Sequence, residues 1–278
     1  MDSGIRTRTP EVLSEGVRDQ YADGKAAKIW KAVIGDEKQR TQVYKDFLMG
    51  LLRENGCKRI LDVACGTGID SIMLIEEGFQ VVSVDASDKM LKYALKDRWD
   101  RRKEPGFDDW VIEEANWLTL TEDIGHLIGD GFDAVICLGN SFAHIHDTYG
   151  DQREQKQILK NFEMCLKPGG FLLIDHRNFD AILDGESPHM KEIRTSVYSV
   201  SGVSRVIIQD YFMSLDEKNE DPENQNHFRL TGYPHRLNAF KDMLREIFSQ
   251  KTHKIFGDFK PLNEVKVPGC FIHLIEKK

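Results

Sequence analysis

Residues 58–85 contain two apolar segments separated by a glycine turn and a short apolar helix, which predicts a strand–turn–helix–strand unit. Gly66 and Gly68 allow the turn to bend tightly and allow a ligand to approach the backbone. Asp85 ends the second strand about 20 residues further on, where a carboxylate can accept hydrogen bonds from a ribose diol. The unit therefore indicates an α/β domain that binds a nucleoside.

Two departures from the dinucleotide-binding pattern narrow the class of nucleoside. Ser71 occupies the place of the third glycine, and the chain contains no Gly-Lys-Ser or Gly-Lys-Thr phosphate loop. A sulfonium nucleoside carries no phosphate, so these departures favour S-adenosylmethionine over NAD. Asp62 in the first strand, together with Gly66, Gly68 and Asp85, makes the pattern more specific than a Gly-x-Gly turn alone. The alternative is a tight turn with a purely structural role.

Length and charge limit the classes of protein that remain. The chain has 278 residues, which is enough for one large domain or for one domain with a lid. An apolar content of 40% supports a hydrophobic core. The net charge of −8 argues against a nucleic-acid partner, because phosphate backbones attract clustered Lys and Arg. The locally basic segment 97–103 is typical of a solvated helix end.

Targeting and cysteine patterns indicate a cytoplasmic protein. No apolar stretch reaches the roughly 18 residues that a membrane span needs, and residues 1–8 contain no apolar signal core. The cysteines are odd in number, lack Cys-x-x-Cys spacing and fall mostly in apolar segments, so we expect reduced core residues. They are Cys57, Cys65, Cys137, Cys165 and Cys270.

Strands and helices alternate through the middle of the chain. We expect an N-terminal arm and helices over residues 1–50, followed by a core over residues 51–178. The alternation predicts a mostly parallel sheet with helices on both faces. The expected core strands are Arg59–Ala64, Gln80–Val84, Val111–Glu114, Phe132–Leu138 and Phe171–Asp175. A helix from about Gln152 to Leu166 precedes the last of them.

The pattern changes after Asn178. Period-two alternation predicts a small antiparallel lid over residues 179–233. Its expected strands are Arg194–Val200, Ser204–Met213 and His227–Leu230. Residues 234–278 are expected to form a helix, Leu237–Phe248, and a closing hairpin, Ile255–Phe259 with Gly269–Ile275.

Candidate site residues follow the ends of three expected strands. Asn116 and Trp117 follow the third strand. Together they can form hydrogen bonds with the edge of an adenine and stack on its face. Gly139 and Asn140 follow the fourth strand, and Arg177 follows the fifth. Because ligands of open α/β sheets bind beyond the carboxyl ends of the strands, these groups should meet. Arg177 is suited to a bidentate pair with a substrate carboxylate, and a surface ion pair is the alternative.

Long segments of the chain resemble the animal glycine N-methyltransferase family. The similar segments lie within residues 19–24, 61–68, 83–95, 110–118, 132–144, 174–178 and 257–261. The resemblance implies a Rossmann-like class I methyltransferase that transfers a methyl group from S-adenosylmethionine to glycine, giving sarcosine and S-adenosylhomocysteine. It also implies a role in methyl-group supply and one-carbon metabolism, a cytoplasmic homotetramer, and inhibition by bound folate.

The resemblance assigns cofactor contacts to residues along much of the chain. They are Tyr21, Trp30, Arg40, Ala64, Gly66, Gly68, Asp85, Asn116, Trp117, Leu138 and His144. Arg40 is expected to pair with the methionyl carboxylate, Asp85 to bind the ribose, and Asn116 with Trp117 to hold the adenine. His144 is expected to complete the pocket, with a general base as the alternative role.

For the acceptor, the resemblance implies that Arg177 binds the carboxylate and that Asn140 and the Gly139 carbonyl lie near the amine. Tyr21 and Tyr211 match two of the tyrosines that surround the family's active site. His176 is expected to be structural. No metal site is expected, since the nine histidines are scattered and no His-Glu-x-x-His occurs.

The acceptor half departs from the family pattern at several places. Val33 and Gly232 replace tyrosines, and Ile5 replaces another aromatic residue. About ten residues of the family pattern, including a further tyrosine, are absent between Lys191 and Glu192. We expect wider space at Val33 and Gly232, which leaves two alternatives to a glycine enzyme. One is a glycine/sarcosine N-methyltransferase of betaine synthesis, and the other is a non-catalytic protein that binds S-adenosylmethionine or folate.

Overall fold

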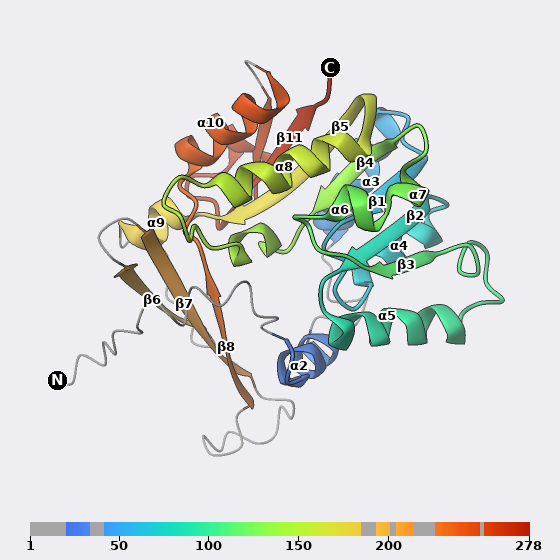
Figure 1. Cartoon of the computed structure of the whole chain (residues 1–278), viewed down its shortest axis with the longest axis horizontal. Coiled ribbons are helices and arrows are strands. Elements are labelled where there is room, and N and C mark those ends of the chain that lie inside the picture. The colour runs from blue at the N-terminus through green and yellow to red at the C-terminus, as the bar shows by residue number, and fades with distance from the viewer. Residues whose placement is uncertain (1–20, 34–41, 185–192, 201–203, 214–225, 251–252) are drawn as a thin grey trace.

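The computed structural model describes residues 21–33, 42–184, 193–200, 204–213, 226–250 and 253–278. Arg40 and residues 1–20 of the expected arm lie outside these ranges, as does the junction at residues 185–192. Figure 1 shows a larger α/β unit with a smaller sheet beside it.

The main sheet has eight strands within the described residues, in the order β10-β9-β11-β5-β4-β1-β2-β3. The pairs from β5 through β4, β1 and β2 to β3 are parallel, whereas β5 pairs with β11, β11 with β9, and β9 with β10 in antiparallel orientation. The bounds are β1 Arg59–Asp62, β2 Gln80–Asp85, β3 Val111–Glu114, β4 Phe132–Cys137, β5 Leu166–Arg177, β9 Lys254–Gly257, β10 Lys260–Pro261 and β11 Cys270–Glu276.

Helices cover both faces of the main sheet because its central strands are apolar on both sides. Neighbouring residues of a strand point to opposite faces, and Ile60 and Leu61 of β1 belong to two different buried clusters. The cluster on the Leu61 side includes residues of α8 and α10, and the cluster on the Ile60 side includes residues of α3 and α4. The helices are α2 Lys25–Val33, α3 Gln42–Glu54, α4 Ile69–Glu76, α5 Asp88–Asp100, α6 Leu120–Asp123, α7 Gly125–Ile128, α8 Arg153–Cys165, α9 Phe179–Leu183 and α10 Leu237–Phe248, with 3-10 turns η2 Ser141–His144 and η4 Leu262–Glu264.

The smaller sheet is antiparallel, in the order β6-β7-β8. Its strands are β6 Ile193–Val200, β7 Ser204–Met213 and β8 Asn226–Gly232. The expected mostly parallel sheet and the small antiparallel sheet are both confirmed. The division into four segments that was expected from the sequence stays a prediction.

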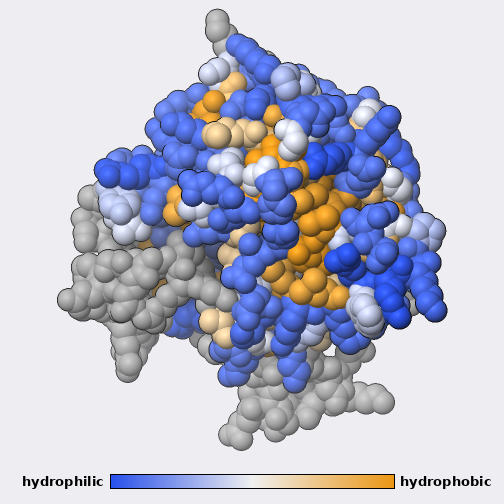
Figure 2. Space-filling view, turned by 45° about the vertical axis from the view of Figure 1, so that its right-hand side comes forward, coloured by the Kyte–Doolittle hydropathy of each residue, from blue (hydrophilic) through white to orange (hydrophobic). Residues whose placement is uncertain are grey.

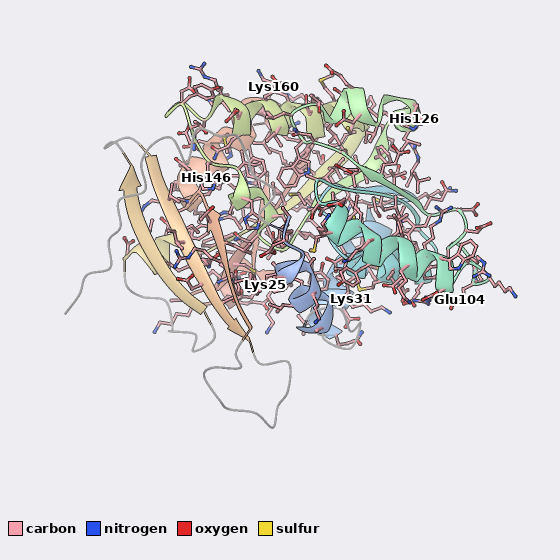
Figure 3. The ribbon with its side chains drawn as sticks, turned by 60° about the horizontal axis from the view of Figure 1, so that its bottom comes forward. Lys25, Lys31, Glu104, His126, His146 and Lys160 are labelled. Carbon is pink, nitrogen blue, oxygen red and sulfur yellow. The ribbon has the colours of Figure 1, made fainter. Side chains whose placement is uncertain are left out.

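Helix α2 lies between the smaller sheet and α5 of the larger unit (Figures 1 and 3). Trp30 packs edge-on against Tyr211 and Phe228 of the smaller sheet, at ring distances of 5.4 and 5.5 Å. One residue further along, Lys31 forms an ion pair with Asp97 of α5, at 2.5 Å between Nζ and Oδ2. The N-terminal segment expected to contact the cofactor therefore lies between the smaller sheet and the core.

The start of β5 differs from the expected boundary. A helix was expected to end at about Leu166 and the next strand to begin at Phe171, yet β5 begins at Leu166. Gly169 has a φ of 77°, and its N–H donates to the Lys277 carbonyl at 3.0 Å. A register shift in the β4–β5 pairing accommodates this segment. Residues 167–170 thus extend the strand, because the backbone of Lys277, directly after β11, supplies hydrogen-bond partners.

The amino ends of the parallel strands lie opposite the predicted site. A groove of about 710 Å³ there is lined by residues that include Phe79, Val81 and Val111. Figure 2 shows apolar side chains gathered in a band on the face that carries this edge of the sheet. None of the helices in the described ranges is long and apolar enough to cross a membrane.

Candidate functional site

The turns at the carboxyl ends of β1 and β2 are joined by Asp85. Its Oδ2 accepts a hydrogen bond from the Gly66 N–H at 2.9 Å, and its Oδ1 accepts one from the Ser87 N–H at 2.9 Å. These two hydrogen bonds fix the orientation of a carboxylate, a group that can accept several hydrogen bonds at once. The half-buried carboxylate lies beside the glycine turn, as the sequence pattern predicts.

Gly66 and Gly68 both have positive φ, at 54° and 88°. A Cβ on Gly68 would also lie 2.7 Å from the Trp110 indole, which is fully buried. The second glycine of the motif is therefore required by backbone conformation and by packing inside the protein, in addition to any ligand.

A buried hydrogen-bond network lies under this turn and explains Ser71. The Ser71 hydroxyl donates to Asp62 Oδ2 at 2.7 Å and lies 2.7 Å from the Ser83 hydroxyl. The Trp110 indole N–H donates to the same Ser83 oxygen at 2.7 Å. A third glycine at position 71 would remove the partner of a buried carboxylate. Burial raises the pKa of Asp62 to about 7, and the Ser71 hydrogen bond opposes that shift.

Asn116 and Trp117, the predicted adenine contacts, follow β3. The Asn116 side-chain oxygen accepts from the Leu118 N–H at 3.0 Å. The Trp117 indole N–H donates to the Val63 carbonyl at 2.6 Å, and its ring stacks on Phe142. Since the indole donor is already used, Trp117 is suited to contact a ligand through its ring face.

Asp175 fixes the turn after β4. Its carboxylate accepts from the Gly139 N–H at 3.1 Å and from the Asn140 N–H at 2.7 Å. Asn140 has a φ of 61°, a left-handed conformation that costs about 1–3 kcal/mol in a non-glycine residue. Hydrogen bonds to a charged group contribute about 1.5–3 kcal/mol each, so two of them offset that cost. The Asn140 side-chain oxygen then accepts from the Arg177 N–H at 3.0 Å.

Asp175 was not among the residues predicted for the site, although the sequence contains a signal for it. It occupies the last part of an apolar strand, as Asp85 does in β2, and is only 7% exposed. A buried acid at the carboxyl end of a parallel strand is well placed to accept turn N–H groups.

The Arg177 side chain is half-buried at the end of β5. Within the described ranges, no Asp or Glu forms an ion pair with its guanidinium. This observation does not favour the alternative role of Arg177, a surface ion pair. Tyr211 of β7 is close enough for Arg177 to act on it electrostatically: burial raises the pKa of the Tyr211 phenol, and the Arg177 charge opposes this. The structure thus brings Gly139, Asn140, Arg177 and Tyr211 to one end of the sheet.

Aromatic and histidine contacts join the N-terminal segment and β8 to the same end. The Tyr21 ring meets His144 edge-on at 6.3 Å. His144 Nδ1 lies 3.2 Å from the Thr231 carbonyl, and His146 Nε2 lies 3.0 Å from the Thr231 hydroxyl. Burial lowers the pKa of His144. A neutral His144 that donates from Nδ1 keeps Nε2 unprotonated.

Gly232 does not leave the open space expected from the loss of a tyrosine. A Cβ at this position would lie 2.8 Å from the Ala143 carbonyl oxygen. The same oxygen accepts from the Tyr233 N–H at 2.6 Å. The end of β8 therefore packs directly on η2, where backbone fills the volume next to Gly232. Val33 ends α2, and its side chain lies outside the described part of the chain.

The remaining predicted cofactor residues are distributed around the same end of the sheet. Ala64 follows β1 and packs against the buried cluster that contains Leu61. Leu138 directly follows β4 and is 7% exposed. Arg40 lies outside the described residues, so the predicted partner of the methionyl carboxylate is the one cofactor contact without a position.

The amino-acid sequence of the chain is similar to those of known methyltransferases. A methyltransferase domain family matches residues 54–226. Glycine N-methyltransferase from Mus musculus is 53% identical, covering 100% of this chain and 99% of that protein. Glycine/sarcosine N-methyltransferase from Parasynechococcus marenigrum is 34% identical, covering 90% and 82%.

A solved structure is also similar in fold. It is an S-adenosylmethionine-dependent methyltransferase from Clostridium acetobutylicum, with a TM-score of 0.61 and 19% identity. The alignment covers 92% of this chain and 98% of that one. The expected Rossmann-like methyltransferase fold is confirmed.

Asp62 should make stability depend on pH. Its folded-state pKa of about 7 lies above the ordinary 3.8, so the folded protein binds a proton that the unfolded chain releases. Between about pH 7 and pH 4, stability should rise as pH falls. Asp62→Asn lacks this titrating group. The free energy of unfolding of the wild type, minus that of Asp62→Asn, should therefore increase by up to about 4 kcal/mol as the pH falls from about 7 to about 4. Urea unfolding at several pH values measures this, and Asp109→Asn, an exposed acid, is the control. A flat difference would contradict the prediction.

Asp175→Asn should loosen the turn after β4. An amide has one acceptor oxygen, so one of the two N–H groups now bound by the carboxylate loses its partner. The free energy of unfolding should fall by about 1–3 kcal/mol. Asp130→Asn, at an exposed position before β4, should change it by less than about 0.5 kcal/mol. Chemical unfolding of both variants compares them, and equal effects would show that Asp175 does not hold the turn.

Proposed function

Because the chain belongs to the glycine N-methyltransferase family, we propose that it is an enzyme that transfers a methyl group from S-adenosylmethionine to the amine of glycine. The products are sarcosine and S-adenosylhomocysteine. The observation that carries the proposal is the arrangement at the carboxyl ends of β1, β2, β4 and β5, where a nucleoside-type turn adjoins an arginine without an ion-pair partner among the described residues.

We propose that the β1 and β2 ends bind the nucleoside. S-adenosylmethionine, when bound, supplies a methyl group on a positively charged sulfur. Asp85 accepts hydrogen bonds from the ribose, Gly66 and Gly68 keep the turn free of side chains, and the Trp117 ring face contacts the adenine. The Asp85 orientation supports this role, because Gly66 and Ser87 already fix its carboxylate.

We propose that the β4 and β5 ends bind the acceptor. Arg177 pairs with the glycine carboxylate, and the Gly139 carbonyl and Asn140 lie beside its amine. Tyr21 and Tyr211 close the site from the N-terminal segment and the smaller sheet. An in-line displacement requires a neutral amine at about 3–3.5 Å from the methyl carbon. The task of these residues is therefore orientation, and Asp175 and Asn140 supply rigidity through their hydrogen bonds.

A glycine/sarcosine enzyme is the second candidate. Its relatives are 34% identical or less among those compared, against 50–53% for the glycine enzymes. The close packing at Gly232 also removes one reason to expect a larger acceptor pocket. Product analysis with glycine, sarcosine and dimethylglycine separates these candidates: dimethylglycine formed from sarcosine supports the second, and ligand binding without turnover supports a non-catalytic protein.

Assembly, folate binding and location remain predictions from the family resemblance. We propose a homotetramer, inhibition by bound folate and a cytoplasmic location. Size measurement in solution and folate titration of the full chain test the first two.

Arg177→Lys should weaken glycine binding selectively. Lysine keeps the charge and loses the planar pair of donors, so the KM for glycine should rise roughly tenfold, which corresponds to about 1.4 kcal/mol. The kcat should fall as well, because the carboxylate sets the position of the amine. Steady-state kinetics measure both, with cofactor affinity by calorimetry expected unchanged.

The matched control is Arg102→Lys, at an exposed position of the α5 end, which should leave glycine kinetics unchanged. Normal glycine kinetics in Arg177→Lys would remove Arg177 from the acceptor site. Loss of cofactor binding would instead assign Arg177 to the other ligand.

Asp85→Asn should weaken S-adenosylmethionine binding. The amide keeps the shape but lacks the charge that strengthens hydrogen bonds from hydroxyls, so affinity should fall by about 1.5–3 kcal/mol. Calorimetric titration measures the affinity. Asp88→Asn, a nearby exposed acid at the start of α5, serves as the control. Equal affinities in the two variants would exclude Asp85 from the cofactor site.

A further inference from the structure

Three histidines form a continuous hydrogen-bonded chain behind Arg177. His176 Nδ1 lies 2.9 Å from the Arg177 carbonyl oxygen, and His176 Nε2 lies 3.1 Å from His273 Nε2. His273 Nδ1 lies 2.9 Å from His253 Nε2. His176 of β5 and His273 of β11 are 0% exposed, and His253, just before β9, is half-buried. We call these three residues the histidine chain.

The rings of the histidine chain are neutral. Burial lowers the pKa of His176 and of His253 to about 4, and lowers that of His273 well below 6.5. The charges of Lys241 and Arg245 on α10 oppose protonation of His253 as well. Asp180 favours protonation of His176, but burial is the larger effect.

Neutrality fixes the position of every proton in the histidine chain. A carbonyl oxygen can only accept, so His176 must donate from Nδ1 and leave its Nε2 unprotonated. His273 must then donate from Nε2 to His176 and accept at Nδ1. His253 in turn donates from Nε2, and its own Nδ1 is a buried atom without a hydrogen-bond partner among the described residues. All three hydrogen bonds therefore run in one direction, toward Arg177.

Aromatic packing holds the inner rings of the histidine chain in place. Phe240 of α10 meets His176 at 4.8 Å and His273 at 5.3 Å between ring centres. The centres of the two imidazole rings lie 5.1 Å apart with 23° between their planes, as expected for nearly coplanar rings joined through their Nε2 atoms. A ring confined in this way aims its N–H at a fixed point, since its neighbours oppose rotation.

The peptide backbone at Arg177 is thereby bonded to side chains on both sides. Its N–H donates to Asn140, which Asp175 holds, and its carbonyl accepts from His176, which His273 holds. We propose that the histidine chain is a positioning device that fixes the Arg177 backbone and so aims its guanidinium at the acceptor. The second part rests on the proposed acceptor role of Arg177.

Two substitutions at one position test the proposal. His273→Phe keeps an aromatic ring but leaves His176 Nε2 without its donor. His273→Gln offers an amide N–H toward His176 and an oxygen toward His253. In the full-length protein, His273→Phe should raise the KM for glycine roughly five- to tenfold, as expected for the loss of one buried hydrogen bond. Cofactor affinity should stay unchanged, and His273→Gln should restore the KM to within about twofold of the wild type.

Leu274→Ala, a buried neighbour on β11, controls for loss of stability alone. It should lower the Tm without raising the KM for glycine. If His273→Phe does not fold, His253→Ala at the half-buried end should show the same effect to a smaller degree. An equal rise in KM for His273→Phe and Leu274→Ala, or no restoration by His273→Gln, would overturn the positioning role.

Nuclear magnetic resonance tests the histidine chain without any turnover. Nitrogen chemical shifts should show the Nδ1–H form of His176 and the Nε2–H forms of His273 and His253, and an Nε2–H form of His176 would overturn the proposal. Hydrogen exchange at the Arg177 amide should accelerate in His273→Phe and not in Leu274→Ala. If these results hold while Arg177→Lys leaves glycine kinetics normal, the acceptor role of Arg177 fails and its fixation by the histidine chain stands.

Discussion

Carboxylates at the carboxyl ends of parallel strands hold the turns on which the candidate site depends. Asp85 accepts backbone N–H groups from two turns, and Asp175 accepts two successive N–H groups from the turn after β4. Each carboxylate binds turn residues with positive φ, namely Gly66 for Asp85, and Gly139 with Asn140 for Asp175. Without these hydrogen bonds the turns would be free to change conformation. The ligand-facing groups therefore occupy set positions before any ligand is bound, which lowers the free-energy cost of binding.

The acceptor side also depends on how the smaller sheet is attached. His144 and His146 contact Thr231, and the end of β8 lies against Ala143. Trp30 of α2 packs against Tyr211 of β7. These contacts join three parts of the chain that are far apart in sequence. A shift of the smaller sheet would move Tyr211 relative to Arg177, so acceptor geometry and sheet packing are coupled.

Much of the fold could be predicted because its signals are local. Apolar strands such as β1 and β4, glycine turns and period-two alternation after Asn178 each follow from neighbouring residues. The beginning of β5 could not be predicted in this way, because its glycines become a strand only through pairing with Lys277. The acid Asp175 was missed for a related reason: the N–H groups it binds belong to the turn after β4, about 35 residues away in sequence.

The sequence by itself determined the alternation of strands and helices, the nucleoside-type turn and the residue types available for the chemistry. Only the tertiary structure decided which of them act together. It turned Ser71 from a departure into the partner of Asp62, filled the space beside Gly232 with backbone, and aligned three histidines distant in sequence behind Arg177. The reason is physical: turns and periodicity arise from neighbours along the chain, whereas burial, proton positions and cavity shape arise from contacts between strands that folding brings together.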